Sequence, residues 1–63
     1  MKRKVLIGHI VKNGCMFIRK GAKHSVFFNP LVKRSSTVPR HNEIDYFLTV
    51  KICRDLGIDE LKK

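Results

Sequence analysis

The sequence contains three histidines, His9, His24 and His41. Of the common side chains, imidazole has the ordinary pKa that lies closest to neutral pH. His24 has the most basic setting, because Lys20 and Lys23 bracket it in the stretch KGAKH and an apolar run follows. An imidazole in that place can transfer a proton while ammonium groups stabilise charge that builds on phosphate oxygens. We therefore treat His24 as the candidate catalytic residue, against the simpler alternative of a structural strand histidine.

The positive charge of the chain is concentrated in its first two thirds. The 63 residues carry a net charge of +9, and residues 1–42 contain ten basic side chains and no acidic one. All five acidic residues follow, from Glu43 onward. Such a field favours a polyanion, nucleic acid first, although an acidic protein fits almost as well. A merely solubilising surface, the remaining alternative, usually mixes both signs.

Neither a metal ion nor a cofactor is expected at His24. The three histidines are scattered along the sequence, and no carboxylate lies close to His24. A zinc site needs clustered nitrogen, sulfur or oxygen ligands. Cys15 and Cys53 show no metal or redox spacing and lie in apolar patterns. They are predicted to be buried free thiols, which is consistent with a reducing cytoplasm.

The elements that position His24 follow from local patterns. Apolar side chains at helical spacing predict an amphipathic helix over residues 2–13. A strand is predicted over residues 15–20, and Gly21-Ala22 suits a two-residue hairpin loop of type II′. The return strand over residues 24–29 then begins with His24 itself. The buried stripe of the helix is expected to be Leu6, Ile7, Ile10 and Val11.

The second half of the chain predicts a third strand and a second helix. The strand covers residues 35–39, and Asp45 is the expected N-cap of the helix, which Gly57 ends. The buried face of this helix is expected to be Leu48, Ile52 and Leu56. The fold class is therefore α+β, with two helices packed on one face of a small antiparallel sheet.

A chain of 63 residues forms one domain, here residues 1–63, with a thin core and a site at its surface. No apolar stretch approaches the ~20 residues of a membrane-spanning helix. The basic N-terminus is followed by an apolar segment that Gly8 and His9 interrupt, which makes a poor signal peptide. No membrane association is expected.

Four stretches stand in a particular order: KNG at the end of the first predicted helix, then RKGAKHSVFFNP, TVPRHNEI and KICRDLGI. In this order and at this spacing they resemble the HicA toxins of bacterial and archaeal toxin–antitoxin systems. The resemblance spans about residues 2–58, nearly the whole chain. A glycine followed three residues later by histidine is common alone, but NP and VPRH at these distances make the pattern specific.

The resemblance implies a fold similar to double-stranded-RNA-binding domains, with helix, three strands and helix in that order. It implies a ribosome-independent endoribonuclease that cleaves mRNA with one essential histidine, at the position of His24. It also implies a HicB-type antitoxin protein that binds the toxin and covers this site. Two alternatives stand beside it: a non-catalytic RNA-binding module on the same fold, and a former toxin kept only as the partner of an antitoxin.

RNA contacts are expected around His24, from Lys20, Gly21, Lys23, Arg40 and His41. The guanidinium of Arg40 can bind two phosphate oxygens at once. His41 either assists in phosphate binding or only shapes the loop before the second helix.

Two further regions leave alternatives open. The basic residues at positions 2–4 either bind RNA backbone or form a solvated end. Of the adjacent pair Phe27 and Phe28, one must face away from the helices because strand side chains alternate. That outward ring is a candidate contact for an antitoxin or for self-association. Phe17, Phe27 and Phe28 either stack on bases or, as strand aromatics usually do, serve only the structure.

Overall fold

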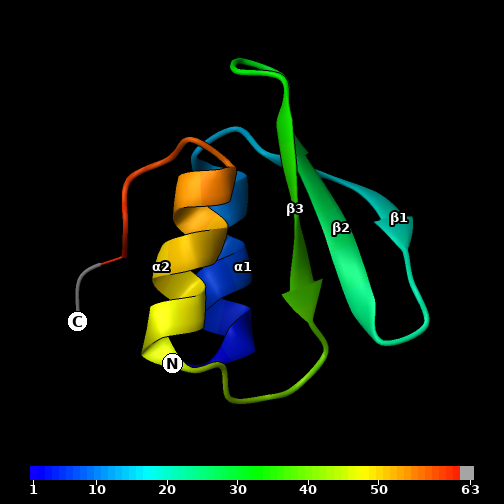
Figure 1. Ribbon diagram of the computed structural model, residues 1–63, viewed down its shortest axis with the longest axis vertical. Helices are drawn as coiled ribbons and strands as arrows, with labels where there is room; N and C mark the ends of the chain where they lie inside the picture. The colour runs from blue at the N-terminus through cyan, green and yellow to red at the C-terminus, as the bar shows by residue number, and fades with distance from the viewer. Residues whose placement is uncertain (62–63) are drawn as a thin grey trace.

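The computed structural model describes residues 1–61 and confirms the predicted order of elements (Figure 1). In chain order these are α1 (Arg3–Lys12), β1 (Met16–Lys20), β2 (His24–Asn29), β3 (Arg34–Pro39) and α2 (Tyr46–Asp55). The three strands form one antiparallel sheet in the order β1-β2-β3, so β2 is its central strand. The bounds of β2 match the prediction, β1 and β3 differ from it by one residue at their first end, and α1 is one residue shorter at each end.

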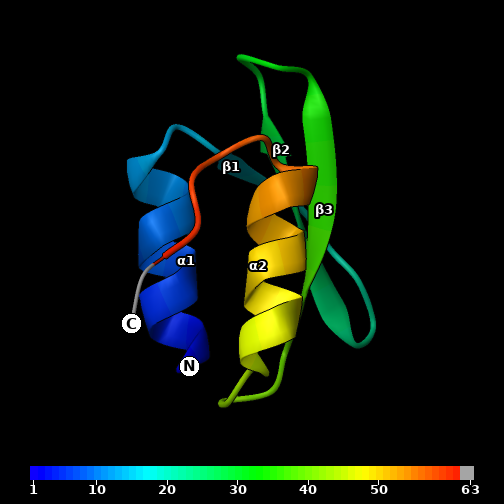
Figure 2. The same cartoon turned by 60° about the vertical axis from the view of Figure 1, so that its left-hand side comes forward.

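Two layers make up the molecule, which measures 28 × 27 × 16 Å. Figures 1 and 2 show both helices on the same side of the sheet. We call that side the inner face and the opposite side, which no helix covers, the outer face. The core lies between the layers and consists of Leu6, Ile10, Cys15, Phe27, Val38, Ile44, Ile52, Cys53 and Leu56.

The predicted stripe of α1 is only partly correct. Leu6 and Ile10 are fully buried and Ile7 is half-buried, but Val11 is 55% exposed. A 3.6-residue period fixes which side chains share a face, but the width of the buried face depends on what packs against it. Of the four predicted residues, only Leu6 and Ile10 are accordingly buried in the core.

The face of α2 turns slightly from its predicted position. Ile52 and Leu56 are buried as expected, whereas Leu48 is only half-buried. Cys53, predicted to be buried but not assigned to this face, and Thr49, which the prediction left out, are buried beside them. Thr49 can be buried because its hydroxyl donates to the carbonyl of Tyr46 at 2.6 Å. Asp45 is at the N-cap position as predicted, but its side chain makes no capping hydrogen bond.

Buried polar contacts tie the sheet to the helices. The Asn29 side chain, 2% exposed, donates from Nδ2 to the Leu56 carbonyl at 2.8 Å, and its Oδ1 accepts from Leu31 N at 3.0 Å. The first bond joins the end of β2 to the end of α2, and the second closes the turn that follows β2. The free thiols of Cys15 and Cys53 are buried, as predicted, and burial raises the pKa of both.

Alternation along β2 decides which way His24 faces. Ser25, Phe27 and Asn29 are buried and therefore point to the inner face. His24, together with the remaining residues of β2, Val26 and Phe28, consequently points to the outer face. The candidate catalytic side chain is on the side of the sheet that no helix covers.

β1 is an exposed edge of the sheet. All five of its residues are exposed, and it includes Met16 at 50%, Phe17 at 54% and Ile18 at 50%. The pairing with β2 is irregular between Phe17 and Arg19, which indicates a bulge at Ile18.

Within residues 1–61, no helix is both long and apolar enough to cross a membrane.

Candidate active site

His24 is the first residue of the central strand and lies opposite Pro39 of β3. Just beyond this pair, Arg40 N donates to the Lys23 carbonyl at 3.3 Å. That bond brings two of the predicted phosphate-binding residues, Lys23 and Arg40, to the same end of the ladder as His24. The side chains of all three are exposed.

Gly21 lies against His24, and a close contact, not the predicted type II′ turn, explains why this position is a glycine. The loop between β1 and β2 has three residues, and Gly21 does not have a positive φ, so the predicted type II′ turn is wrong. Gly21 N donates to the His24 carbonyl at 2.7 Å. A Cβ at Gly21 would lie 2.9 Å from that carbonyl oxygen and 3.3 Å from both Cδ2 and Nε2 of the imidazole. Gly21 is therefore required for the close approach of His24, with its ring packed over the Gly21 backbone.

Packing, and not hydrogen bonding, orients the imidazole. The His24 side chain is exposed and makes no hydrogen bond to any of residues 1–61. Both ring nitrogens are thus available to a bound substrate. An imidazole free at both nitrogens can either accept or donate a proton in a reaction.

Arg3 connects the first helix to the strand ends beside His24. Its Nε donates to the Pro39 carbonyl at 2.8 Å, and its Nη2 donates to Ser25 Oγ at 3.0 Å. Pro39 is the cross-strand partner of His24 and Ser25 is its neighbour in sequence. Arg3 therefore holds the backbone of the site from the inner side, a role that the sequence alone did not reveal.

Arg19, for which no role was predicted, shares the face of His24, and the predicted Lys20 does not. Lys20 pairs with Ser25, whose side chain points to the inner face, so Lys20 is directed away from the face of His24. Arg19 pairs with Val26 and is therefore on the same face as His24. Alternation was the available signal, since an unbulged two-residue hairpin would also place Arg19 on the His24 face.

His41 lies in the segment between β3 and α2, where its side chain is exposed. In the described part of the chain no hydrogen bond joins it to His24. The structure thus places it after the ladder end without showing which of its two predicted roles applies.

The charge around the site is uncompensated. The ion pairs among residues 1–61 join the Met1 ammonium to Glu43, Lys51 to Asp55 and Arg54 to Glu60. None of the ten basic side chains in residues 1–42 takes part in them. The positive field predicted for the first two thirds of the chain is therefore available to an external anion.

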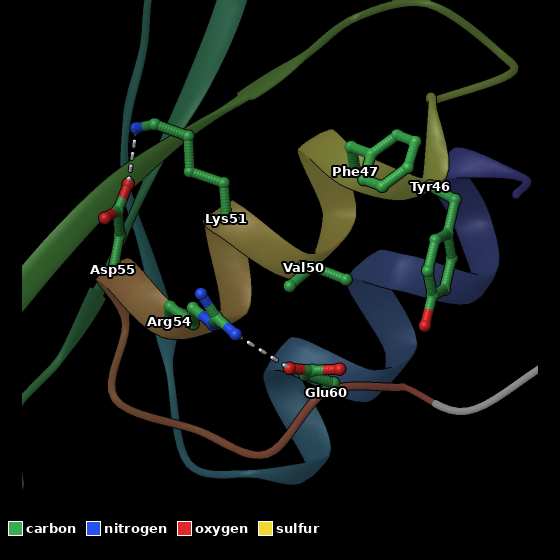
Figure 3. Close-up of a pocket in the computed structure, with 7 residues that line it drawn as sticks. All are labelled: Tyr46, Phe47, Val50, Lys51, Arg54, Asp55 and Glu60. Atoms are coloured by element: carbon green, nitrogen blue, oxygen red, sulfur yellow. Dashed lines mark hydrogen bonds and ion pairs between the residues drawn. The ribbon is translucent and has the colours of Figure 1, made fainter.

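A hollow of about 480 Å³ lies on α2, on the helix side of the molecule (Figure 3). Its cations are neutralised, because Lys51 Nζ lies 3.1 Å from Asp55 Oδ2 and Arg54 Nη2 lies 3.7 Å from Glu60 Oε2. This hollow lacks the uncompensated charge that characterises the surroundings of His24. Its lining residues are Tyr46, Phe47, Val50, Lys51, Arg54, Asp55 and Glu60.

Within residues 1–61 no three His, Cys, Asp or Glu side chains come together as potential metal ligands. No family model matches the chain, and comparisons with curated proteins and with solved structures find no match either. The functional argument therefore depends on the residues of this chain.

Proposed function

We propose that the chain is the toxin of a toxin–antitoxin system, a HicA-like endoribonuclease that cleaves mRNA with His24 as its single catalytic histidine. The observation that carries the proposal is an exposed imidazole with two free nitrogens at the ladder end where the backbones of Lys23 and Arg40 meet, in a segment whose basic side chains form no ion pair with a carboxylate of residues 1–61. The order of elements and the stretches of sequence that resemble HicA toxins support it.

The chemistry requires little from the protein. The 2′-hydroxyl of RNA attacks the adjacent phosphorus, and the 5′-oxygen leaves. This attack is intramolecular and already benefits from proximity. His24 either takes the proton of the attacking 2′-hydroxyl or gives one to the leaving 5′-oxygen, and water exchanges the proton at the other end. The cations of Lys23 and Arg40 stabilise the charge on the phosphate oxygens. The proposed mechanism needs neither a metal ion nor the ribosome.

The proposed setting follows from the same features. An uncompensated basic surface suits RNA as the substrate and an acidic protein as the inhibitor. A HicB-type antitoxin would act by covering His24 on the outer face. Two buried free thiols suit a reducing compartment, so we place the protein in the cytoplasm.

The decisive test is a cleavage assay on a structured mRNA with wild-type protein and a His24→Ala variant. Loss of general acid–base catalysis should lower the cleavage rate by about 10²–10⁴-fold. His9→Gln is the matched control, because His9 contacts Asp59 and Asn13 and not the site. A folded His24→Ala protein with full activity would disprove the assignment. All-deoxy oligonucleotides should remain intact, and a chelator should not stop cleavage.

One observation favours the alternative of a non-catalytic RNA-binding module. Catalytic histidines are commonly oriented by a third group, and no hydrogen bond orients the imidazole of His24 within the described residues. This alternative predicts RNA binding that weakens steeply with salt but no cleavage by the wild type. The same cleavage assay therefore separates the two functions.

A further inference from the structure

β2 presents a row of three side chains on the open side of the sheet. His24, Val26 and Phe28 all point to the outer face, whereas Phe27 between them is buried at 3% exposed. Val26 and Phe28 remain partly exposed because no helix covers this face. Phe28 thus presents an aromatic ring on the same face as the proposed catalytic residue.

Cationic, hydroxyl and apolar groups flank this row. Arg19 of β1 and Thr37 of β3 pair with Val26 from its two sides, and Met16 of β1 and Ser35 of β3 pair with Phe28. Cross-strand partners share a face, so all four side chains stand on the outer face. All four are exposed, and none of the strands contains a carboxylate.

The spacing of the row suits an extended nucleic-acid strand. Side chains on one face of a strand repeat about every 6.6 Å, so Phe28 stands about 13 Å along β2 from His24. We propose that the outer face binds single-stranded RNA, with a base stacked on Phe28 and a phosphate bound by Arg19. On the proposed function, on which this inference rests, the stacked base lies about two nucleotides from the phosphate cleaved at His24.

The composition of the face favours this occupant over a duplex or a protein. Stacking on Phe28 requires a base whose π-face is free, which a paired and stacked helix does not offer. Sheet surfaces that combine aromatic rings with basic side chains recognise single strands in this way. Met16 adds an apolar side chain beside Phe28, but Arg19, Ser35 and Thr37 leave the centre of this face more polar than the centre of a protein interface.

The test measures the binding of a fluorescent eight-nucleotide RNA in the His24→Ala background, where the probe is not cut. Phe28→Leu keeps an apolar side chain but removes the aromatic face, and should weaken binding by roughly 5- to 150-fold. Phe28→Tyr should restore it. Phe47→Leu is the matched control, because Phe47 is a 79% exposed ring on α2, away from the outer face (Figure 3). The same RNA annealed to its complement should bind more weakly than the single strand.

A second variant keeps the test independent of packing at Phe28. Arg19→Gln changes an exposed side chain, and should reduce the slope of log affinity against log salt by about 0.7, the contribution of one phosphate of a single strand. An unchanged slope would contradict the phosphate contact. Equal affinities of Phe28→Leu and the parent, or tighter binding of the duplex, would overturn the stacking site. Self-association lost in Phe28→Leu with RNA affinity unchanged would assign the face to a protein contact instead.

The outcomes separate this inference from the nuclease proposal. If the wild type cleaves RNA and Phe28→Leu binds RNA as tightly as its parent, only the proposed RNA-binding role of the outer face is overturned. If Phe28→Leu binds RNA more weakly and the wild type does not cleave it, only the nuclease proposal is overturned.

Discussion

Gly21→Ala should separate catalysis from RNA binding. Gly21 has no positive φ, so alanine is compatible with its backbone and the effect is purely steric. The new Cβ would lie 2.9 Å from the His24 carbonyl oxygen and 3.3 Å from two atoms of the imidazole. Ordinary contact begins at 3.4 Å, so the backbone oxygen of His24 must move by about 0.5 Å.

The size of the effect follows from this displacement. Overpacking costs about 1–3 kcal/mol, and the stiffer unfolded chain offsets about 0.4–1 kcal/mol of it. The free energy of unfolding should therefore fall by up to about 2.6 kcal/mol. A misplacement of about 1 Å costs on the order of 10²-fold in rate, so a shift of half that size should slow cleavage by about 10-fold. Affinity for RNA should hardly change, because Lys23 and Arg40 keep their charges.

The assay compares cleavage rate, RNA affinity and urea stability for Gly21→Ala and a control. Gly8→Ala is the control, since an added Cβ at Gly8, in the interior of α1, meets no atom within 4 Å. It should gain about 0.5–1 kcal/mol of stability and keep full activity. A folded Gly21→Ala protein that cleaves at the wild-type rate would refute the packing of His24 against Gly21.

Two further predictions concern stability. Arg3→Ala removes two charge-assisted hydrogen bonds and leaves the buried Ser25 hydroxyl without that partner. Urea denaturation should therefore show a loss of about 1.5–3 kcal/mol of unfolding free energy for Arg3→Ala, and of less than about 0.5 kcal/mol for the control Lys4→Ala, which changes an exposed side chain. Wild-type stability of Arg3→Ala would mean that these bonds contribute nothing. Burial raises the pKa of Cys15 and Cys53 above the ordinary 9.0, so the unfolded chain loses these protons first. The unfolding free energy should therefore be unaffected by these thiols below pH 9.0 and fall above it, and a Cys15→Ala variant should show a smaller fall.

The elements of this fold were predictable because their signals are local. Helical and strand periodicities set the element bounds to within a residue or two. Gly14, whose φ is 90°, marks the end of α1. The depth of burial was less predictable. Val11 is exposed and Thr49 is buried because the packing of each helix against its neighbours decides how much of its face is covered.

The sequence predicted which residues lie near the candidate site, but not which face of the sheet each side chain points to. The backbones of His24, Lys23 and Arg40 meet at one end of the ladder between β2 and β3, as the order of the strands suggests. Lys20 was assigned to the site because it is close to His24 in sequence, but pairing directs it to the other face. The contacts of Arg3 with residues 22 and 36 positions away depend on how α1 docks, and no local pattern encodes that.

The exposed edge strand β1 gives the basic charge of this chain a second consequence. Met16, Phe17 and Ile18 are half exposed on a strand whose outer edge is unpaired, a combination that promotes edge-to-edge association. A net charge of +9 opposes the approach of two copies at low ionic strength. Salt weakens that repulsion as well as the attraction of RNA. Colloidal stability and nucleic-acid affinity should thus decline together as ionic strength rises, and bound RNA, by neutralising the charge, would also lower the barrier to association of the complexes.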